Sequence, residues 1–447
     1  MNRPNVIHII AHDLGKEIGL YGAGFSTPNL DSFGRAGVTF NQCYCTSTAC
    51  SPSRGCGMTG QTAHTNGLVG LANPGALWHM PLATRTMVDD FNDAGYETAH
   101  SGMQHERFRK EHNRYQNELP SSGWVEDAVD GAIGFLENRP AGASPFYLNI
   151  GTNEVHSGQW ETYKFDRKVS RAAVYGTVDP QTVRMPSFVP DLPLLRREWA
   201  AFAGCVSYWD SQVGRLLDTI ERLGYYENTI VLITTDHGVA AHRVKSTLYK
   251  EGVEITLLMR IPGGRPGVTV ESMVQNTDLL PTLMDACGIP VRSDIEGRSL
   301  WPLLSGGEYT PYDHVCLERN FHGNFDPMRA IRTEDYALIR NFDLSKTLHY
   351  TPDQVTHTKD SYHRWFTELW PDTVEPCPEF ELFDRRRDPA ERINVAGEAA
   401  YERVLDDLKA KLASWMEKTN DPLLEATDEE GFTRVVRERF EYIEDDR

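Results

Sequence analysis

The residues Asn5-Val-Ile-His-Ile-Ile-Ala-His12-Asp13 join an apolar run of strand length directly to a polar pair. A continuous apolar run is typical of a strand that is buried on both faces, as in the middle of a parallel sheet. In such sheets, ligands bind beyond the carboxyl ends of the strands. His12 and Asp13 therefore become candidate site residues as soon as the first strand is assigned.

Further apolar segments of strand length follow, and helical segments with apolar residues three and four positions apart separate them. This alternation predicts an α/β fold. The strands are expected at residues 38–43, 96–100, 145–151, 229–234 and 255–261, and the clearest helices at residues 125–136 and 206–220. Between residues 168 and 196 the periodicity is replaced by several prolines, which indicates a long loop.

The pattern changes after about residue 304. Short strands are expected at residues 315–319, 328–331, 336–340 and 381–384, with one final helix around residues 401–415. We therefore predict a catalytic domain at residues 1–310 and a smaller C-terminal α+β domain at residues 311–447, with a small antiparallel sheet and a terminal helix.

Composition excludes several classes of partner and location. The 447 residues carry 45 Lys and Arg against 64 Asp and Glu, a net charge of −19, which argues against nucleic acid as a partner. No run reaches the ~20 apolar residues that cross a bilayer. Because the first strand is interrupted by His8 and resembles no signal peptide, a cytoplasmic protein without a membrane partner is expected.

A second informative segment is Cys50-Ser-Pro-Ser-Arg54-Gly-Cys-Gly-Met-Thr-Gly60. Ser-Pro is a helix-opening pair and Gly60 a helix-ending residue, so Cys50 should lie at a helix N-terminus. Free N–H groups there favour an anion, and Arg54 adds a cation one turn further on. An arbitrary buried Cys is more often a structural thiol, and the eight cysteines are too sparse for a disulfide scaffold.

The motif Cys-X-Pro-X-Arg resembles the signature of the type I sulfatases, in which a separate enzyme oxidises the Cys to formylglycine. The likeness extends over most of the chain and implies an alkaline-phosphatase-like large mixed sheet flanked by helices. Within the family, the sulfamidases, which are heparan N-sulfatases, are the most similar group. The matching segments are residues 5–13, 27–31, 229–238 and 381–389, and the sulfamidase-like ones are residues 64–70, 245–249, 326–329 and 415–422.

The resemblance implies a divalent metal site formed by His12, Asp13, Asp236 and His237. Taken singly, each Asp is more often a turn residue. Most of the family has Asp where this chain has His12, so the site is richer in nitrogen than calcium prefers. Calcium is the first expectation, manganese and zinc are alternatives, and His12 acts either as a ligand or as a hydrogen-bonding neighbour of the ligands.

The resemblance also assigns roles to catalytic and substrate-binding side chains. They are Cys50 as the precursor of the nucleophile, Arg54 and His105 at the sulfate, His156 and Lys245 as candidate acids for the leaving group, and His64 and Arg329 as substrate-binding candidates. Isolated histidines near strand ends are more often structural, and the alternative role for His64 is to cap a turn. One hydroxyl of hydrated formylglycine is expected to attack sulfur, and the other to expel sulfate.

Met103 occupies the position of a family lysine that contacts the nucleophile and the sulfate. Arg107 and Arg109 are possible substitutes for that lysine. Its absence leaves a phosphonate monoester or phosphodiester hydrolase as the alternative to a sulfatase, and a non-catalytic binding protein with an unmodified Cys50 as a third hypothesis. The expected partners are a small sulfated substrate such as N-sulfoglucosamine, a transient formylglycine-generating enzyme, and a second copy of the chain in a homo-oligomer.

Overall fold

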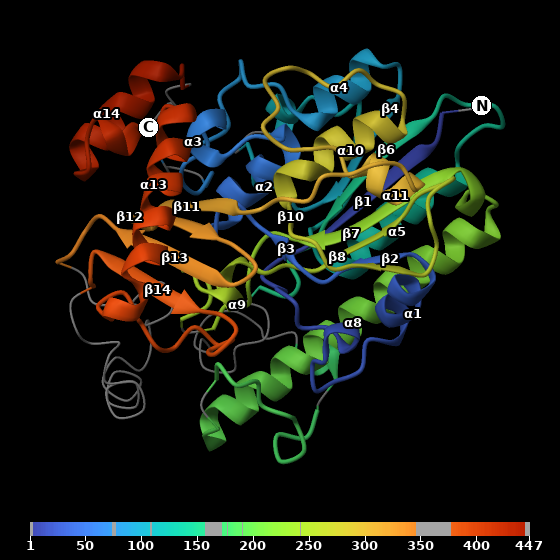
Figure 1. Ribbon diagram of the computed structural model, residues 1–447. Coiled ribbons are helices and arrows are strands. Elements are labelled where there is room, and N and C mark those ends of the chain that lie inside the picture. The colour runs from blue at the N-terminus through green and yellow to red at the C-terminus, as the bar shows by residue number, and fades with distance from the viewer. Residues whose placement is uncertain are drawn as a thin grey trace.

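The computed structural model describes residues 3–442 except 74–76, 108–109, 157–171, 177, 190, 242 and 346–376. Among the described residues, the largest sheet is mixed and has eight strands (Figure 1). In spatial order they are β5 (Asn117–Leu119), β4 (Glu97–Gly102), β6 (Phe146–Gly151), β1 (Asn5–Ala11), β7 (Thr229–Thr235), β8 (Leu257–Arg260), β2 (Val38–Phe40) and β9 (Val268–Val270). Neighbours are parallel except where β8 pairs with β7 and β2.

Side chains of β1 enter two different cores, because successive residues of a strand point to opposite faces. Val6 packs into one core, whereas Ile7 and Ile9 pack into the other. The helices over the Ile7 face are α1 (Pro28–Ala36), α5 (Val125–Glu137) and α8 (Pro193–Arg222). Those over the Val6 face are α2 (Cys50–Thr59), α4 (Met87–Asp93), α10 (Leu279–Ala286) and α11 (Trp301–Ser305). The central sheet is therefore buried on both faces, as the apolar run of β1 predicts.

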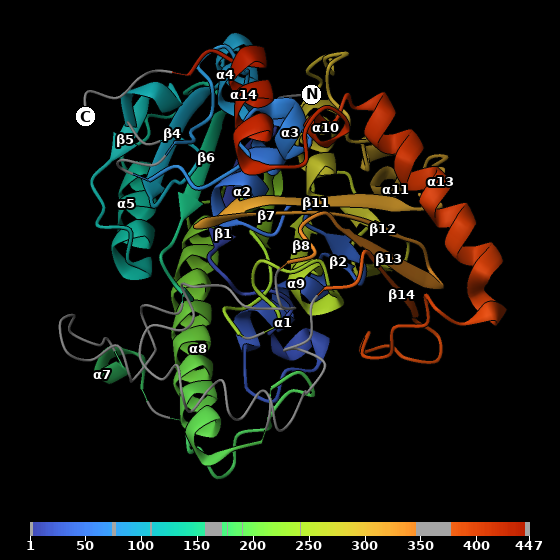
Figure 2. The same cartoon turned by 90° about the vertical axis from the view of Figure 1, so that its left-hand side faces the viewer.

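The C-terminal part forms an antiparallel sheet beside the first (Figure 2). Its strands are β11 (Val315–His322), β12 (Asn324–Arg332), β13 (Tyr336–Asn341) and β14 (Phe380–Asp384). One face packs against α13 (Glu402–Lys418), and the other adds Leu317 and Ile339 to the core that also contains Val6. The predicted domain boundary at residue 310 falls between α11 and β11, and it stays a prediction because the apolar core is continuous across it.

The predicted fold class, an α/β large sheet with a smaller C-terminal α+β part, is confirmed. Two local predictions were wrong. The loop expected at residues 168–196 contains α7 (Ala172–Tyr175) and the start of α8, because Pro193 is compatible with the first turn of a helix. The strand expected at residues 38–43 is divided into β2 and β3 (Cys43–Tyr44), and β3 pairs with β10 (Val274–Gln275) in a separate sheet.

The remaining named helices of the described chain are α3 (Ala63–Asn66), α9 (Lys250–Val253) and α14 (Glu429–Arg439). Helix α14 follows α13 and was not predicted, although Asp428 caps it by accepting from the Gly431 N–H at 2.9 Å. Within the described part of the chain, no helix has both the length and the apolar character needed to span a bilayer.

Candidate active site

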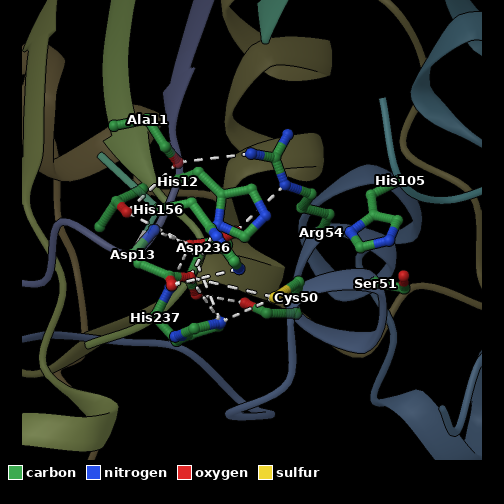
Figure 3. A network of polar contacts seen from close by, with 12 residues as sticks. Ala11, His12, Asp13, Cys50, Ser51, Arg54, His105, His156, Asp236 and His237 are labelled. Atoms are coloured by element: carbon green, nitrogen blue, oxygen red, sulfur yellow. Dashed lines mark hydrogen bonds and ion pairs between the residues drawn. The ribbon is translucent and has the colours of Figure 1, made fainter. Parts of the chain in front are cut away.

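Two polar pairs directly follow the carboxyl ends of two neighbouring strands of the central sheet. β1 and β7 are parallel and end opposite each other, and His12-Asp13 and Asp236-His237 follow their ends directly. Asp13 has a φ of 57°, a left-handed conformation that turns the chain just beyond the strand. Its N–H donates to Oδ1 of Asp236 at 2.9 Å. The strand pairing therefore places the two carboxylates side by side (Figure 3).

Helix α2 brings Cys50 to these carboxylates. Cys50 is its first residue and Gly60 ends it in a left-handed conformation, as the sequence predicts. The Ser53 hydroxyl donates to the main-chain carbonyl of Asp236, and Nε of Arg54 donates to Oδ2 of Asp236 at 3.2 Å. These contacts fix the N-terminus of α2, with its free N–H groups and positive end, at the polar edge of the sheet.

Donor atoms from several elements converge beside Cys50. One ligand atom each from His12, Asp13, Cys50 and Asp236 lie within 4.8 Å of one another. Nδ1 of His12 is 2.7 Å from Oδ1 of Asp13 and 3.5 Å from Oδ2 of Asp236. All four residues are buried. Buried carboxylates and imidazoles around one point form a donor set that suits a divalent cation.

The orientation of His237 supports the same interpretation. Its Nδ1 is 2.9 Å from the carbonyl of Gly238, an acceptor, so Nδ1 carries the proton. Nε2 is then the nitrogen that faces Oδ1 of Asp13 at 3.4 Å and Sγ of Cys50 at 3.3 Å. A second neighbour that fixes the tautomer in this way is characteristic of a metal-binding histidine.

Asp13 uses its two oxygens differently. Oδ2 accepts from Nζ of Lys245 at 2.7 Å and lies 3.8 Å from Nε2 of His156, whereas Oδ1 faces the convergent donors. Burial opposes ionisation of Asp13, but Lys245 and His12 hold its pKa well below the ordinary value. Burial likewise opposes the Cys50 thiolate, yet Lys245 and the histidines nearby lower the pKa of Cys50 well below its usual range. The cluster is therefore built to hold negative charge.

His156 is the most accessible member of this group, with about a third of its side chain exposed (35 %). Its ring stands edge-on to that of His12, with centroids 4.5 Å apart. The loop before it is attached to the end of β1 because the Val155 N–H donates to the carbonyl of His12 at 2.7 Å. Burial and the nearby Lys245 lower the pKa of His156 to about 3. His156 thus lies between the buried carboxylates and the solvent-facing side of the site.

His105 approaches from the other side of Cys50, as Figure 3 shows. A ligand atom of His105 lies within 4.8 Å of those of His12 and Cys50, and its Nε2 is 2.8 Å from the side-chain oxygen of Asn73. The structure therefore brings every catalytic and metal-binding candidate of the sequence into one cluster around Cys50. Only the two substrate-binding candidates have their contacts elsewhere among the described residues.

These two, His64 and Arg329, belong to a separate buried network. Nδ1 of His64, which is on α3, is 3.0 Å from Oε1 of Glu318, and Nη2 of Arg329 donates to Asp421 at 2.8 Å. Oε2 of Glu318 also lies 3.7 Å from the Arg329 guanidinium. All four side chains are buried and directed at one another, so their role in binding substrate stays a prediction.

Of the two substitutes considered for the missing lysine, the structure describes Arg107, and its guanidinium makes its contacts away from Cys50. Met103 is held at the edge of the sheet, where its N–H donates to the carbonyl of Gly151 at 2.8 Å. The buried guanidinium of Arg107 donates to main-chain carbonyls, including that of Thr84 at 2.8 Å, and supports the loop that carries His105. Arg109 lies outside the described residues.

Sequence reasoning missed one residue of the cluster, His322. It is the last residue of β11 and only 4 % exposed, and the neighbouring Cys50 acts to raise its pKa. Burial lowers the pKa of His322, and the cations Lys245 and Arg319 lower it further. No local signal marks this histidine, because it reaches Cys50 only through the packing of the C-terminal sheet.

Comparison with known proteins identifies the chain. A family model described as sulfatase matches residues 4–289, and one described as N-sulphoglucosamine sulphohydrolase, C-terminal, matches residues 236–352. The human N-sulphoglucosamine sulphohydrolase is 27 % identical over 95 % of this chain and 92 % of its own length. An N-acetylglucosamine-6-O-sulfatase of Bacteroides thetaiotaomicron is 24 % identical over 94 % of this chain and 88 % of its own.

Solved structures agree in fold. One of a protein in complex with its substrate D-glucosamine-2-N,6-O-disulfate superposes with a TM-score of 0.72 at 21 % identity, covering 94 % of this chain and 99 % of that one. A phosphonate monoester hydrolase from Silicibacter pomeroyi superposes with a TM-score of 0.66 at 18 % identity, covering 94 % and 96 %. The fold is thus that of the alkaline-phosphatase-like hydrolases. Within that class the chain belongs to the sulfatase family, and it is a sulfatase that resembles sulfamidase.

Proposed function

We propose that this sulfatase releases sulfate from a sulfated sugar, with N-sulfoglucosamine as the first candidate, and uses formylglycine made from Cys50 and a bound divalent cation. The observation that carries the proposal is the position of Cys50. Cys50 is the first residue of α2. Its Sγ lies 3.3 Å from Nε2 of His237 and 4.0 Å from Oδ1 of Asp13. The match of residues 236–352 to the sulphohydrolase C-terminal model supports the sugar N-sulfate as substrate.

The donor set fits a divalent cation. Asp13, Asp236, His237 and the side chain at position 50 would hold it, and Nδ1 of His12 is close enough to be a fifth donor. The cation would supply a positive charge that stabilises an anionic nucleophile and polarises a sulfo oxygen. Calcium follows from the family resemblance. Because two imidazoles accompany the two carboxylates, manganese and zinc are the alternatives.

The neighbouring cations would bind the sulfo group and help its release. Formylglycine supplies an oxygen nucleophile in place of a thiol. Lys245 and Arg54 neutralise the buried carboxylates at 2.7 and 3.2 Å, so an anionic substrate meets a less negative site than the net charge of the chain suggests. His156 and Lys245 are the candidate acids for the leaving group. A bound sulfo anion raises the pKa of His156 from its low value and favours the protonated form.

Two measurements test the proposal. Mass spectrometry of tryptic peptide 36–54 from the native host reads the state of residue 50, and an unmodified Cys50 throughout would exclude the formylglycine mechanism. A substrate panel of N-sulfoglucosamine, N-acetylglucosamine 6-sulfate, an aryl sulfate and an aryl phosphodiester then compares kcat/KM. We expect the sugar N-sulfate to rank first.

The phosphonate monoester or phosphodiester hydrolase is the second candidate, and Met103 is the observation that favours it. The side chain of Met103 offers no cation to a dianionic group, and a phosphonate monoester hydrolase shares the fold. A higher kcat/KM for the phosphodiester than for every sulfate would select this alternative. A non-catalytic role is not supported, because the chain is a sulfatase.

The partners follow from the same proposal. A formylglycine-generating enzyme would bind the unfolded segment around Cys50 only transiently, since that residue is buried in the folded chain. A homo-oligomer remains a prediction. Size-exclusion chromatography with light scattering measures the oligomeric state directly.

A further inference from the structure

Lys245 is carried by a turn with an unusual backbone. The turn comprises residues 243–246 and lies between β7 and α9. Arg243 and Ser246 both have a φ of 62°, a left-handed conformation that non-glycine residues seldom adopt. Such a conformation persists only where surrounding contacts impose it. The contacts around this turn therefore decide where the Lys245 side chain lies.

Glu391, a residue of the C-terminal part, contacts the chain on both sides of Lys245. Oε2 of Glu391 accepts from the Lys250 N–H at 2.8 Å, and its main-chain carbonyl accepts from Nη2 of Arg243. Glu391 follows β14 in the chain and is fully buried (0 % exposed). One buried residue thus holds the segment both before and after Lys245.

Arg332, on β12, completes this attachment. Its Nη1 donates to the carbonyl of Leu248 at 3.2 Å and lies 3.2 Å from Oε2 of Glu391, while its Nη2 pairs with the other oxygen of that carboxylate. The Tyr249 hydroxyl adds a further contact, because it donates to Oε2 of Glu381 on β14 at 2.7 Å. We call Glu391 and Arg332 the clamp. Both are fully buried, so each charge depends on the other for neutralisation.

The side chain of Lys245 ends at the catalytic cluster. Its Nζ donates to Oδ2 of Asp13 at 2.7 Å, and the residue is only 5 % exposed. Oδ1 of the same carboxylate lies 4.0 Å from Sγ of Cys50. A shift of the turn would therefore move the Lys245 ammonium away from Asp13 and from the nucleophile.

We propose that Glu391 is a positioning residue for catalysis, which acts through Lys245: together with Arg332 it fixes the segment at residues 243–250 and keeps the Lys245 ammonium at the edge of the site. Turnover then depends on a contact between the C-terminal sheet and the segment that follows β7. The inference rests on the proposed function, because it takes Lys245 as a catalytic residue.

A positioning role predicts that two substitutions are not additive. Displacing a catalytic group by about 1 Å can cost on the order of 100-fold in rate, so Glu391→Gln should lower kcat by about 10- to 100-fold. In a Lys245→Met background, the same change should lower kcat by less than about twofold, because the group that Glu391 positions is no longer there. A merely structural ion pair would lower stability and leave kcat per folded molecule unchanged.

The experiment measures kcat for Glu391→Gln, Lys245→Met and the double variant on an aryl sulfate with a good leaving group. Formylglycine content, bound metal and the thermal midpoint are measured for each protein, and kcat is expressed per folded, modified and metal-loaded molecule. Asp421→Asn is the matched control, because it also removes the charge of a buried carboxylate that faces an arginine, Arg329. It should leave kcat within about twofold in both backgrounds.

Tyr249→Phe is a milder variant for the case in which Glu391→Gln does not fold. It keeps the ring and removes the hydroxyl that donates to Glu381. This variant should lower kcat in the same direction by about threefold, since one of several attachments is lost, and Lys245→Met should again abolish the effect.

Hydrogen exchange followed by mass spectrometry gives a readout without activity. Glu391→Gln should speed exchange of the amides at residues 243–250 by at least about threefold, whereas Asp421→Asn should leave it unchanged. Unchanged kcat in folded, loaded Glu391→Gln, or an equal loss with and without Lys245, would overturn the inference. A wild type that hydrolyses no sulfate would reject the proposed function itself, whatever the exchange at residues 243–250 shows.

Discussion

The described part of the chain contains two buried groups in which histidine, carboxylate and arginine side chains lie together. One is the cluster of β1, β7 and α2 around Cys50, and the other is the network of His64, Glu318, Arg329 and Asp421 beside the C-terminal sheet. In the second network each charge has an opposite partner, and the Asp421 oxygens accept from the Arg329 guanidinium and from the Leu423 N–H at 3.0 Å. That network is closed, with each carboxylate paired to a cation.

The cluster around Cys50 differs in where its acceptor atoms point. Oδ1 of Asp13, Nε2 of His237 and Sγ of Cys50 face one another within about 4 Å, and Nδ1 of His12 lies 2.7 Å from the same Asp13 oxygen. A closed network stabilises a fold, whereas convergent acceptors are stable only with a cation among them. Both regions thus bury charged groups. The candidate metal site differs because the lone pairs of its side chains point toward one common position.

Arg329→Met tests the closed network and carries the largest expected effect. It leaves the buried Asp421 carboxylate without its cation, which should lower the free energy of unfolding by about 3–5 kcal/mol. Activity and bound metal per folded molecule should stay near the wild-type values. Urea denaturation combined with assays at low temperature checks this, and a large loss of kcat in fully folded protein would show that Arg329 binds substrate after all.

Asp236→Asn tests the convergent cluster. Removing one ligand charge should cut bound metal and kcat together, by at least about 100-fold. Asp421→Asn is the matched control, because it makes the same chemical change in the closed network and should leave metal content unchanged. Elemental analysis and kinetics on both variants decide the point, and full activity with a normal metal content in Asp236→Asn would show that the second metal strand is misassigned.

Chelation separates the two regions without a mutation. If a cation binds only the folded chain, removing it from a sample held at 100 times its Kd should lower the free energy of unfolding by about 2.7 kcal/mol. Chelation should cause the same loss in Arg329→Met, because Arg329 is not one of the candidate metal ligands. It should cause no further loss in Asp236→Asn. Denaturant titrations with and without chelator measure these differences. Equal stability of chelated and untreated wild type would contradict a metal among Asp13, Asp236 and His237.

Much of the fold and of the catalytic cluster could be predicted because their signals are local in sequence. The apolar run of β1 ends at His12-Asp13, the run of β7 ends at Asp236-His237, and Gly60 ends α2. Parallel pairing of the two strands then makes these separate segments neighbours. Each step needs only the periodicity of one segment and the rule that sites lie at the carboxyl ends of strands.

The rest depends on tertiary packing that no short segment encodes. His64 and His322 are both single histidines outside any metal-like spacing, yet one pairs with Glu318 and the pKa of the other is influenced by Cys50. Which partner a histidine meets is decided by how β11 lies along the segments beside α2. Resemblance placed His64 among the substrate-binding residues, and only the described contacts show that its buried partner is a carboxylate of the chain itself.

The smallest expected effect concerns the pH dependence of the closed network. Burial opposes charge on His64, but the Glu318 carboxylate raises its pKa above the ordinary value, and His64 in turn helps to lower the pKa of Glu318 to about 2. The folded chain therefore keeps the His64 proton to a higher pH than the unfolded chain does. This contribution is complete below about pH 6.5 and is lost as the pH rises through the folded-state pKa of His64.

Above pH 6.5, the free energy of unfolding of the wild type should therefore decrease as the pH rises. His64→Gln should make this decrease less steep by up to about 1.4 kcal/mol per pH unit, which is the value for one proton. The catalytic cluster is the same in both proteins, so its contribution cancels in the comparison. If wild type and His64→Gln lose stability in parallel between pH 6 and pH 9, His64 is not charged in the folded chain, and the second network is not balanced as its contacts imply.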